Sequence, residues 1–256
     1  MVSNPDMFPM QLNRSFIVII YRTHSILNKR IAILLLLLLP AMLAAQKAKP
    51  KNDSNYDERL LHFGFSMGAN TMDFNVKMQS ESGLTAEVVS LKPGLNIQII
   101  TDFRPTTYLD IRFLPGVSFG QRNINFYEDG ILWGEPQILE SSFLEFPLLV
   151  KAKGMRLNNA RPYLIGGLNF RYDLAGKKEY DDSRNVHMRL KRADYYYELG
   201  AGIDFYLPYF KLTIEAKMSN GLRDVLVHVP DERHPEYTNS IKSLRSQIWV
   251  LSFHFE

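Results

Sequence analysis

Residues 195–217 read YYYELGAGIDFYLPYFKLTIEAK, and this stretch decides the fold. Apolar side chains occupy every second position from Tyr195 to Phe205, and the alternation resumes at Leu212. Most of the intervening residues are Gly, Glu, Asp, Thr or Lys. A period of two places successive side chains on opposite faces of a β-strand. The stretch therefore predicts two antiparallel strands joined by a tight turn around Pro208.

The same alternation recurs along the chain from Leu61 to Glu256. Each alternating segment is close to the length of a tilted membrane strand, about 9–11 residues. We see no internal repeat beyond this hairpin rhythm and no second domain. The eight predicted strands are Leu61–Phe74, Gly94–Arg104, Tyr108–Gln121, Ser142–Lys153, Arg161–Leu174, Tyr195–Leu207, Lys211–Ser219 and Gln247–Glu256.

Long and short connections alternate between these segments. Long loops at one end and tight turns at the other are typical of an outer-membrane barrel. Eight antiparallel strands can also close into a ring without leaving an edge, as lipid requires. The predicted fold is therefore all-β, an eight-stranded antiparallel transmembrane barrel. The long connections are Met78–Lys92, Arg122–Leu139, Ala175–Ala193 and Asn220–Ser246, and the short ones are Pro105–Thr107, Gly154–Ala160 and Pro208–Phe210.

Two kinds of barrel fit this rhythm, and they differ in the face that points outward. A soluble barrel with a ligand cavity buries its apolar face, whereas a membrane barrel turns that face to lipid. An almost uninterrupted apolar face and a glycine-rich polar face favour the membrane barrel. The stretch WVLSFHF at residues 249–255 resembles the C-terminal signal of outer-membrane barrels, although Glu256 departs from it. Aromatic residues near strand ends match interfacial girdles: Phe103, Tyr108, Tyr163, Tyr172, Tyr195, Tyr209, Phe210 and Trp249.

Six basic and six acidic residues lie on the polar faces. Balanced charges suit a lumen filled by ion pairs, because an unpaired buried charge is costly. Eight strands enclose a space just wide enough for side chains to fill, so we expect a closed lumen and no general-diffusion pore. The predicted lumen charge network consists of Asp102, Arg104, Asp110, Arg112, Glu145, Lys151, Lys153, Arg171, Glu198, Asp204, Glu215 and Lys217.

The N-terminal part of the chain predicts export. Lys29 and Arg30 precede an apolar run that is too short to span a bilayer as a helix and that ends in small residues. We expect a signal peptide over residues 1–45, with residues 1–28 reflecting a start codon assigned too early. Residues 46–59 have no apolar periodicity and predict a flexible periplasmic tether, and residues 60–256 form the barrel domain.

The overall composition excludes several classes of protein. The net charge of +3 arises in the export signal, so the remaining chain is neutral and the sequence predicts no nucleic-acid partner. The chain has no cysteine, which excludes disulfides, thiolate metal sites and acylation of a lipobox cysteine.

No residue pattern predicts catalysis, a cofactor or a metal. His228 and His234 share a loop, but their spacing is nonspecific for a metal site. His62 and His254 lie on the first and last strands, which pair in a closed barrel, and we expect them to form a hydrogen-bonded pair in the lumen. We also expect no small-molecule substrate.

Several segments resemble the PorT family, called SprT in gliding bacteria. The likeness covers nearly all of residues 60–256. It rests on LHFGFSMGANTMDF (Leu61–Phe74), RFLPGVSFGQR (Arg112–Arg122), EFPLLVKAK (Glu145–Lys153), RPYLIGG (Arg161–Gly167) and GAGIDFYLPYFKLTIEAK (Gly200–Lys217).

The resemblance implies an outer-membrane barrel that is required for type IX protein secretion and, in gliding relatives, for motility. Its expected partners are the lipid bilayer and proteins of the secretion machinery. No catalytic or ligand residues transfer with the likeness. Three alternatives remain open: a surface-binding or adhesion protein working through its long loops, an outer-membrane enzyme, and a soluble secreted barrel.

Overall fold

A computed structural model describes residues 52, 56, 58–79, 83–176, 187–229 and 234–256. The predicted signal peptide, residues 1–45, lies outside the described residues, so its cleavage and the start codon stay predictions.

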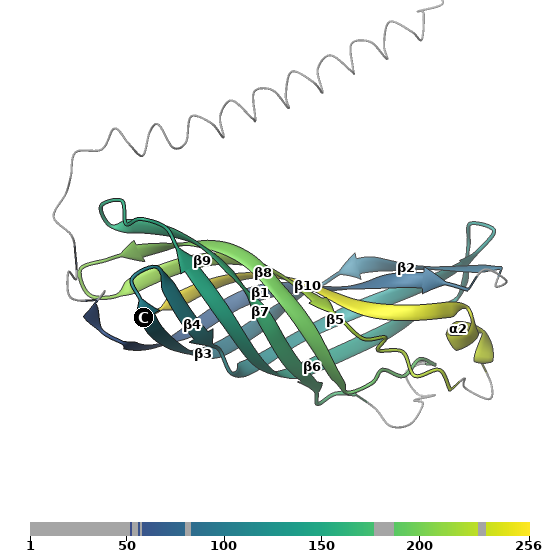
Figure 1. Cartoon of the computed structure of the whole chain (residues 1–256). Coiled ribbons are helices and arrows are strands. Elements are labelled where there is room, and N and C mark those ends of the chain that lie inside the picture. Colours follow the sequence, from purple (N-terminus) through teal and green to yellow (C-terminus); the bar gives the residue numbers. More distant parts are fainter. Residues whose placement is uncertain (1–51, 53–55, 57, 80–82, 177–186, 230–233) are drawn as a thin grey trace, which may run out of the picture. The chain divides into compact units, whose positions relative to one another are not determined.

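The described chain forms one antiparallel sheet that closes on itself (Figure 1). A short helix, α2 (Pro235–Asn239), is the one helix among the described elements, and it is not long and apolar enough to cross a membrane. The strands are β1 (Leu61–Met78), β2 (Leu84–Leu91), β3 (Pro93–Thr106), β4 (Leu109–Phe113), β5 (Gly116–Glu128), β6 (Ile131–Lys153), β7 (Ala160–Asp173), β8 (Ala193–Tyr206), β9 (Lys211–Gly221) and β10 (Ile241–Phe255).

The first strand closes the ring. β1 pairs with β10 on one side and with β3 on the other, so that Met67 lies opposite both Phe253 and Ile97. The ring then runs β1, β3, β4 with β5, β6, β7, β8, β9 and β10. Closure leaves no unpaired edge, which is the condition for a sheet in lipid. The predicted antiparallel barrel is confirmed, and its ring has eight positions.

The structure has more strands than predicted because one strand is broken and one loop is ordered. The predicted strand Tyr108–Gln121 divides into β4 and β5 at Leu114 and Pro115, where proline supplies no amide donor for the ladder. β2 lies in the predicted loop Met78–Lys92 and pairs with β5 outside the ring.

The predicted loop Arg122–Leu139 is wrong for a different reason. Its residues continue β5 and β6, and the connection is a hairpin with Asp129 and Gly130 at φ 48° and 81°. Positive φ at both central residues is the mark of a type I′ turn, which Asp-Gly favours. β6 has 23 residues. At about 3.3 Å per residue it is on the order of 70 Å long, too long for a bilayer core of about 30 Å even when tilted.

The chemistry of the two faces of β10 reverses along the strand and so marks the membrane boundary. Near the C-terminus the buried residues include His254, while Leu251 faces outward and is 47 % exposed. Towards the start of the strand the buried residues include Leu244, while Lys242 faces outward. The first pattern fits lipid outside and a polar lumen, and the second fits water outside and an apolar interior. We call the part of the barrel with the second pattern the outer extension.

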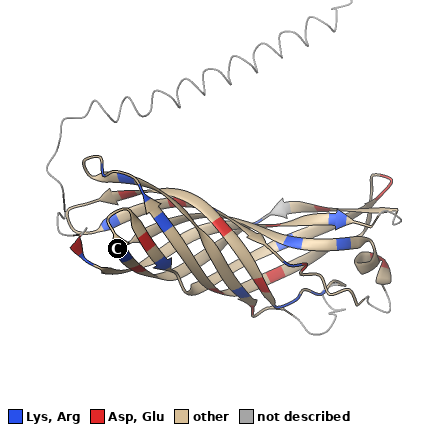
Figure 2. Cartoon of the chain, viewed as in Figure 1, with Lys and Arg blue, Asp and Glu red and all other residues tan. Residues whose placement is uncertain are grey.

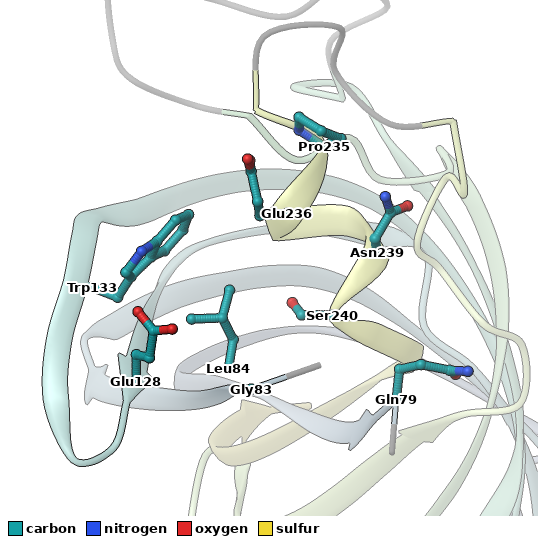
Figure 3. Close-up of a pocket in the computed structure, with 9 residues that line it drawn as sticks. All are labelled: Gln79, Gly83, Leu84, Glu128, Trp133, Pro235, Glu236, Asn239 and Ser240. Carbon is teal, nitrogen blue, oxygen red and sulfur yellow. The ribbon is translucent and has the colours of Figure 1, made fainter. Parts of the chain in front are cut away.

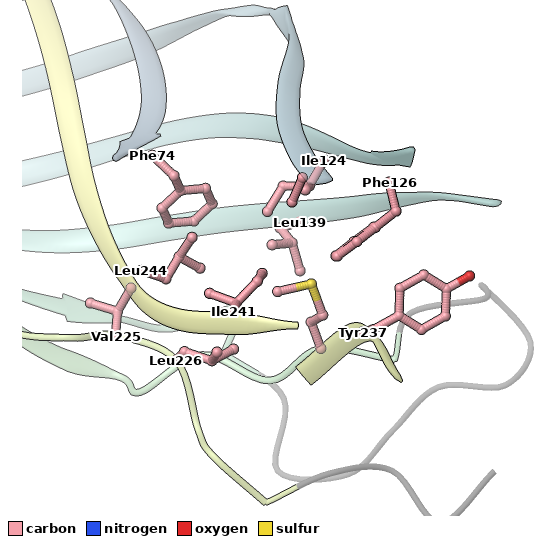
Figure 4. Close-up of a cluster of buried hydrophobic side chains, with 11 residues drawn as sticks. Phe74, Ile124, Phe126, Leu139, Val225, Leu226, Tyr237, Ile241 and Leu244 are labelled. Atoms are coloured by element: carbon pink, nitrogen blue, oxygen red, sulfur yellow. The ribbon is translucent and has the colours of Figure 1, made fainter. Parts of the chain in front are cut away.

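The outer extension has its own apolar core (Figure 4). Because long loops are extracellular in such barrels, this end faces outward and the short turns face the periplasm. We call this core the apolar cap. Strand and loop residues both contribute to it: Phe74, Ala86, Ile124, Phe126, Leu139, Met188, Val225, Leu226, Tyr237, Ile241 and Leu244.

The boundary on β10 can be tested with cysteines, because the chain contains none. We expect Lys242→Cys to react with a membrane-impermeant maleimide on intact cells, since this side chain is exposed in the outer extension. We expect Leu251→Cys, on the same strand, to react only after denaturation because lipid covers it.

Gel shifts of the labelled barrel would measure both reactions. Equal labelling of the two cysteines on intact cells would contradict the boundary, and labelling of Lys242→Cys only after the outer membrane is permeabilised would reverse the orientation.

Candidate functional site: the charged lumen

All twelve residues of the predicted lumen charge network are buried, none more than 5 % exposed. Figure 2 shows charged residues on successive strands around the barrel. The alternation of each strand turns these side chains inward, because their neighbours in sequence face lipid. The structure brings the twelve together in ion pairs that form layers along the lumen.

One group of ion pairs is centred on Arg112. Its guanidinium donates two hydrogen bonds to the Asp102 carboxylate, at 2.7 and 2.6 Å, and the two residues lie opposite each other on β3 and β4. It also lies 2.9 Å from Glu256 and 3.6 Å from Glu215. Such bidentate, charge-assisted bonds are the strongest that a guanidinium makes.

Two other carboxylates of this region are held by lysines and an arginine. Asp110 accepts hydrogen bonds from Arg104 Nε at 3.0 Å and Lys153 Nζ at 2.6 Å. Both carboxylate oxygens of Asp204 accept hydrogen bonds from Lys151 Nζ, each at 2.9 Å. Each pair connects different strands, so the lumen holds the ring together from inside.

The middle layer is built on two glutamates. Arg171 lies between them, 2.9 Å from Glu145 and 3.1 Å from Glu198. Lys217 Nζ lies 2.8 Å from Glu198, and Ser118 donates to Glu145 at 2.6 Å. Each carboxylate therefore meets a cation and a neutral donor, which is what a buried charge needs to be tolerated.

Two further members of the network lie at its periplasmic end and were not predicted, Lys211 and Glu256. Lys211 Nζ lies 2.7 Å from Glu256 Oε2, and both side chains are about 1 % exposed. The alternation contained the signal, because Phe255 belongs to the lipid face and its neighbour must then point into the lumen. The departure of Glu256 from the aromatic C-terminal pattern follows from this ion pair.

Arg122 marks the top of the lumen and was also missed. Its guanidinium donates to Ser246 at 2.8 Å and Ser141 at 2.6 Å, and lies 4.0 Å from the centre of the Phe74 ring. Phe74 belongs to the apolar cap, so this arginine joins the polar lumen to the cap through a cation–π contact.

The charges of the lumen balance. The buried basic and acidic side chains among the described residues number nine each, with Glu256 included for its side chain of 1 % exposure. A net charge would attract ions and water, whereas neutrality lets the side chains pair with each other. This balance fits the expected closed lumen, which stays a prediction.

The periplasmic mouth is covered by residues that precede the barrel. Tyr56 is 5 % exposed, stacks on His62 with ring centres 4.0 Å apart, and donates to Glu256 at 2.8 Å. Burial raises the pKa of Tyr56, so its hydroxyl stays protonated and able to donate. Asn52 also contacts the barrel, donating to the carbonyl of Tyr206 at 3.0 Å.

The tether over residues 46–59 stays a prediction, although two of its described residues contact the barrel. At Asn52 and Tyr56 the segment lies on the barrel, because an aromatic ring and an amide fit the polar groups of the mouth. Most of the other residues of that segment lie outside the described ones.

The predicted pair of His62 and His254 does not form. The register places His254 opposite Ser66, and His62 lies opposite Asp102. The first and last strands do pair, but the stagger of a closed barrel shifts the partners along the strands. His254 lies 3.6 Å from Glu215 instead.

The two loop histidines contact different partners. His228 lies 2.6 Å from Asp224, whereas His234 packs on the ring of His187 with centres 4.3 Å apart. Within the described ranges, no cluster of three or more His, Asp or Glu could hold a metal ion.

Residues 44–227 match the family model of the outer membrane protein beta-barrel domain. No curated protein matches the sequence. Among solved structures, the N-terminal β-barrel domain of OprF from Pseudomonas aeruginosa is similar at 10 % identity and a TM-score of 0.34, covering 75 % of this chain and 96 % of that one. OprG from Pseudomonas aeruginosa is similar at 12 % identity and a TM-score of 0.42, with coverage of 76 % and 92 %. The solid-state NMR structure of AlkL in DMPC bilayers is similar at 10 % identity and a TM-score of 0.42, with coverage of 82 % and 92 %.

Removing Arg112, which pairs with three carboxylates in the lumen, should destabilise the barrel. Arg112→Ala leaves three carboxylates without their shared partner, and breaking a buried pair typically costs about 3–5 kcal/mol. We expect a loss of that order in the free energy of unfolding, measured by urea titration of the barrel refolded in lipid vesicles.

The matched control is Arg245→Ala, whose side chain is exposed on β10. It should change the free energy of unfolding by less than about 0.5 kcal/mol. Equal stability of the two variants would show that the network contributes no stability.

Proposed function

The chain belongs to the family of outer membrane protein β-barrel domains, and on that premise we propose that it is a non-enzymatic outer-membrane component required for type IX protein secretion. The packed lumen carries the proposal, because a barrel filled by its own ion pairs works through its two ends. The likeness of five segments to the PorT family supplies the secretion role.

The periplasmic end is the side from which exported proteins arrive. There Tyr56 anchors the segment before β1 on the mouth of the barrel, since Tyr56 bonds to Glu256 and Arg104 Nη1 donates to the carbonyl of Tyr56 at 3.0 Å. This anchored segment and the short turns make up the periplasmic surface. A rigid surface loses little entropy when a partner binds. We propose this surface as the contact with the secretion machinery.

A closed lumen predicts that the purified protein does not conduct ions. We expect planar bilayers containing it to show no persistent channels in concentrated KCl, whereas a general-diffusion porin in the same preparation conducts. Stable, ohmic channels at the single-molecule level would show that the lumen opens, and would favour transport through the barrel.

The secretion role is tested by deleting the gene and locating proteins that carry type IX C-terminal signals. We expect them to accumulate in the periplasm and to return to the surface or medium when the gene is expressed again. Normal export in the deletion strain would refute the secretion role and leave the barrel and its location.

One observation favours a second function, binding at the cell surface. Ile131 and Leu132, at the tip of the β5–β6 hairpin, are 74 % and 50 % exposed although they lie beyond the lipid-facing band. Exposed apolar residues above a membrane are typical of contact sites. Complementation with Ile131→Ser and Leu132→Ser separates the two functions: normal export with reduced attachment of cells supports surface binding, and normal attachment opposes it.

A further inference from the structure

An open cavity of about 540 Å³ lies in the outer extension (Figure 3). It forms where the end of β1, the start of β2, the β5–β6 hairpin and α2 meet, and its lining includes Trp133, Glu128 and Glu236. Its size falls in the range of about 300–1,000 Å³ that is typical of small-molecule sites. The sequence did not predict this cavity, because residues from three separate segments (79–84, 128–133 and 235–240) line it.

The apolar cap holds the walls of the cavity in place. The indole of Trp133 packs on the ring of Tyr237 with centres 5.1 Å apart, and Tyr237 packs edge-on against Phe126 at 4.9 Å. The backbone N–H of Gln79 donates to the backbone carbonyl of Ser240 at 2.8 Å and so joins the end of β1 to the end of α2. A preformed wall reduces the entropy lost on binding.

The chemistry of the lining selects for positive charge. Glu128 and Glu236 are its charged residues, and no lysine or arginine is among the described residues that line it. Figure 3 shows Trp133, Glu128 and Leu84 on one side of the cavity and Asn239 on the other. Carboxylates bind ammonium and guanidinium groups through charge-assisted hydrogen bonds, and an indole face attracts cations.

We propose that this cavity binds a small organic cation, an amine, guanidinium or quaternary ammonium group attached to an apolar group. The cation lies near Glu128 and Glu236, and the apolar group lies against Leu84 and Trp133. This inference deepens the surface-binding function and is independent of the secretion role. The two carboxylates disfavour an anionic ligand by charge repulsion, and a neutral ligand gains no charge-assisted bond from them.

The chain has two tryptophans, so Trp249→Phe leaves Trp133 as the one indole reporter. Trp249 is on the lipid-facing side of β10, outside the cavity. We would titrate this variant, folded in a non-ionic detergent, with benzyltrimethylammonium. We expect a saturable change in Trp133 fluorescence that weakens as salt is added, and a response at least about tenfold weaker to neutral benzyl alcohol.

Matched carboxylate variants locate the site. Glu236→Gln should weaken binding of benzyltrimethylammonium by about tenfold, which corresponds to about 1.4 kcal/mol. Glu87→Gln removes the same charge from an exposed position on β2 that does not line the cavity. It should change the affinity by less than about twofold, the residual effect of a screened charge at a distance.

Three results would overturn the proposal in a barrel that still shows the heat-modifiable mobility of the folded state. These are equal affinity for benzyl alcohol, equal weakening by Glu87→Gln and Glu236→Gln, and saturable binding of glucose without a response to the cation. Each would leave the secretion role untouched, because that role is tested by export in cells. Loss of attachment in the hairpin variant would still support surface binding of a larger partner.

Discussion

The neutralisation of Arg112 inside the barrel is the interaction on which the rest of the structure depends. A guanidinium at 0 % exposure can exist there only with its carboxylates, and those come from β3, β9 and the C-terminal residue. The strands must therefore close around it in one register, because a slip of one residue would turn Asp102 or Glu215 to lipid. The lipid outside the barrel and the paired charges inside it therefore require the same strand register.

The barrel is surrounded by lipid over part of its length and by water over the rest, and its interior side chains differ between the two parts. In the bilayer its inward side chains are mostly polar or charged, and above the bilayer they are apolar, so the long strands β1, β5, β6 and β10 exchange the roles of their two faces. Arg122 stands at this exchange, bonded to Ser141 and Ser246 and stacked on Phe74. One continuous sheet thus serves as a membrane protein over part of its length and as a soluble protein over the rest.

The ring could be predicted from the sequence because alternation is a local signal that survives without any knowledge of partners. The inward direction of the charged residues followed from the same signal. Glu256 was not predicted to point inward because it follows the aromatic stretch at residues 249–255, which is typical of the lipid face. What depends on spacing between distant segments could not be predicted. The pairing of β2 with β5, the stagger that separates His62 from His254, and the cavity beside Trp133 arise from register and loop folding, for which a single sequence has no periodic pattern.

The apolar cap limits how the surface of this protein can vary. Loops of outer-membrane barrels ordinarily tolerate insertions and divergence because they pack on nothing. Here Met188, Leu226 and Tyr237 come from the connections between strands and fill the space above the lumen. Among the described residues of the outer extension, positions such as Glu87 and Lys242 face water and are open to change under selection from outside the cell, while the loop residues of the apolar cap are constrained as any core is.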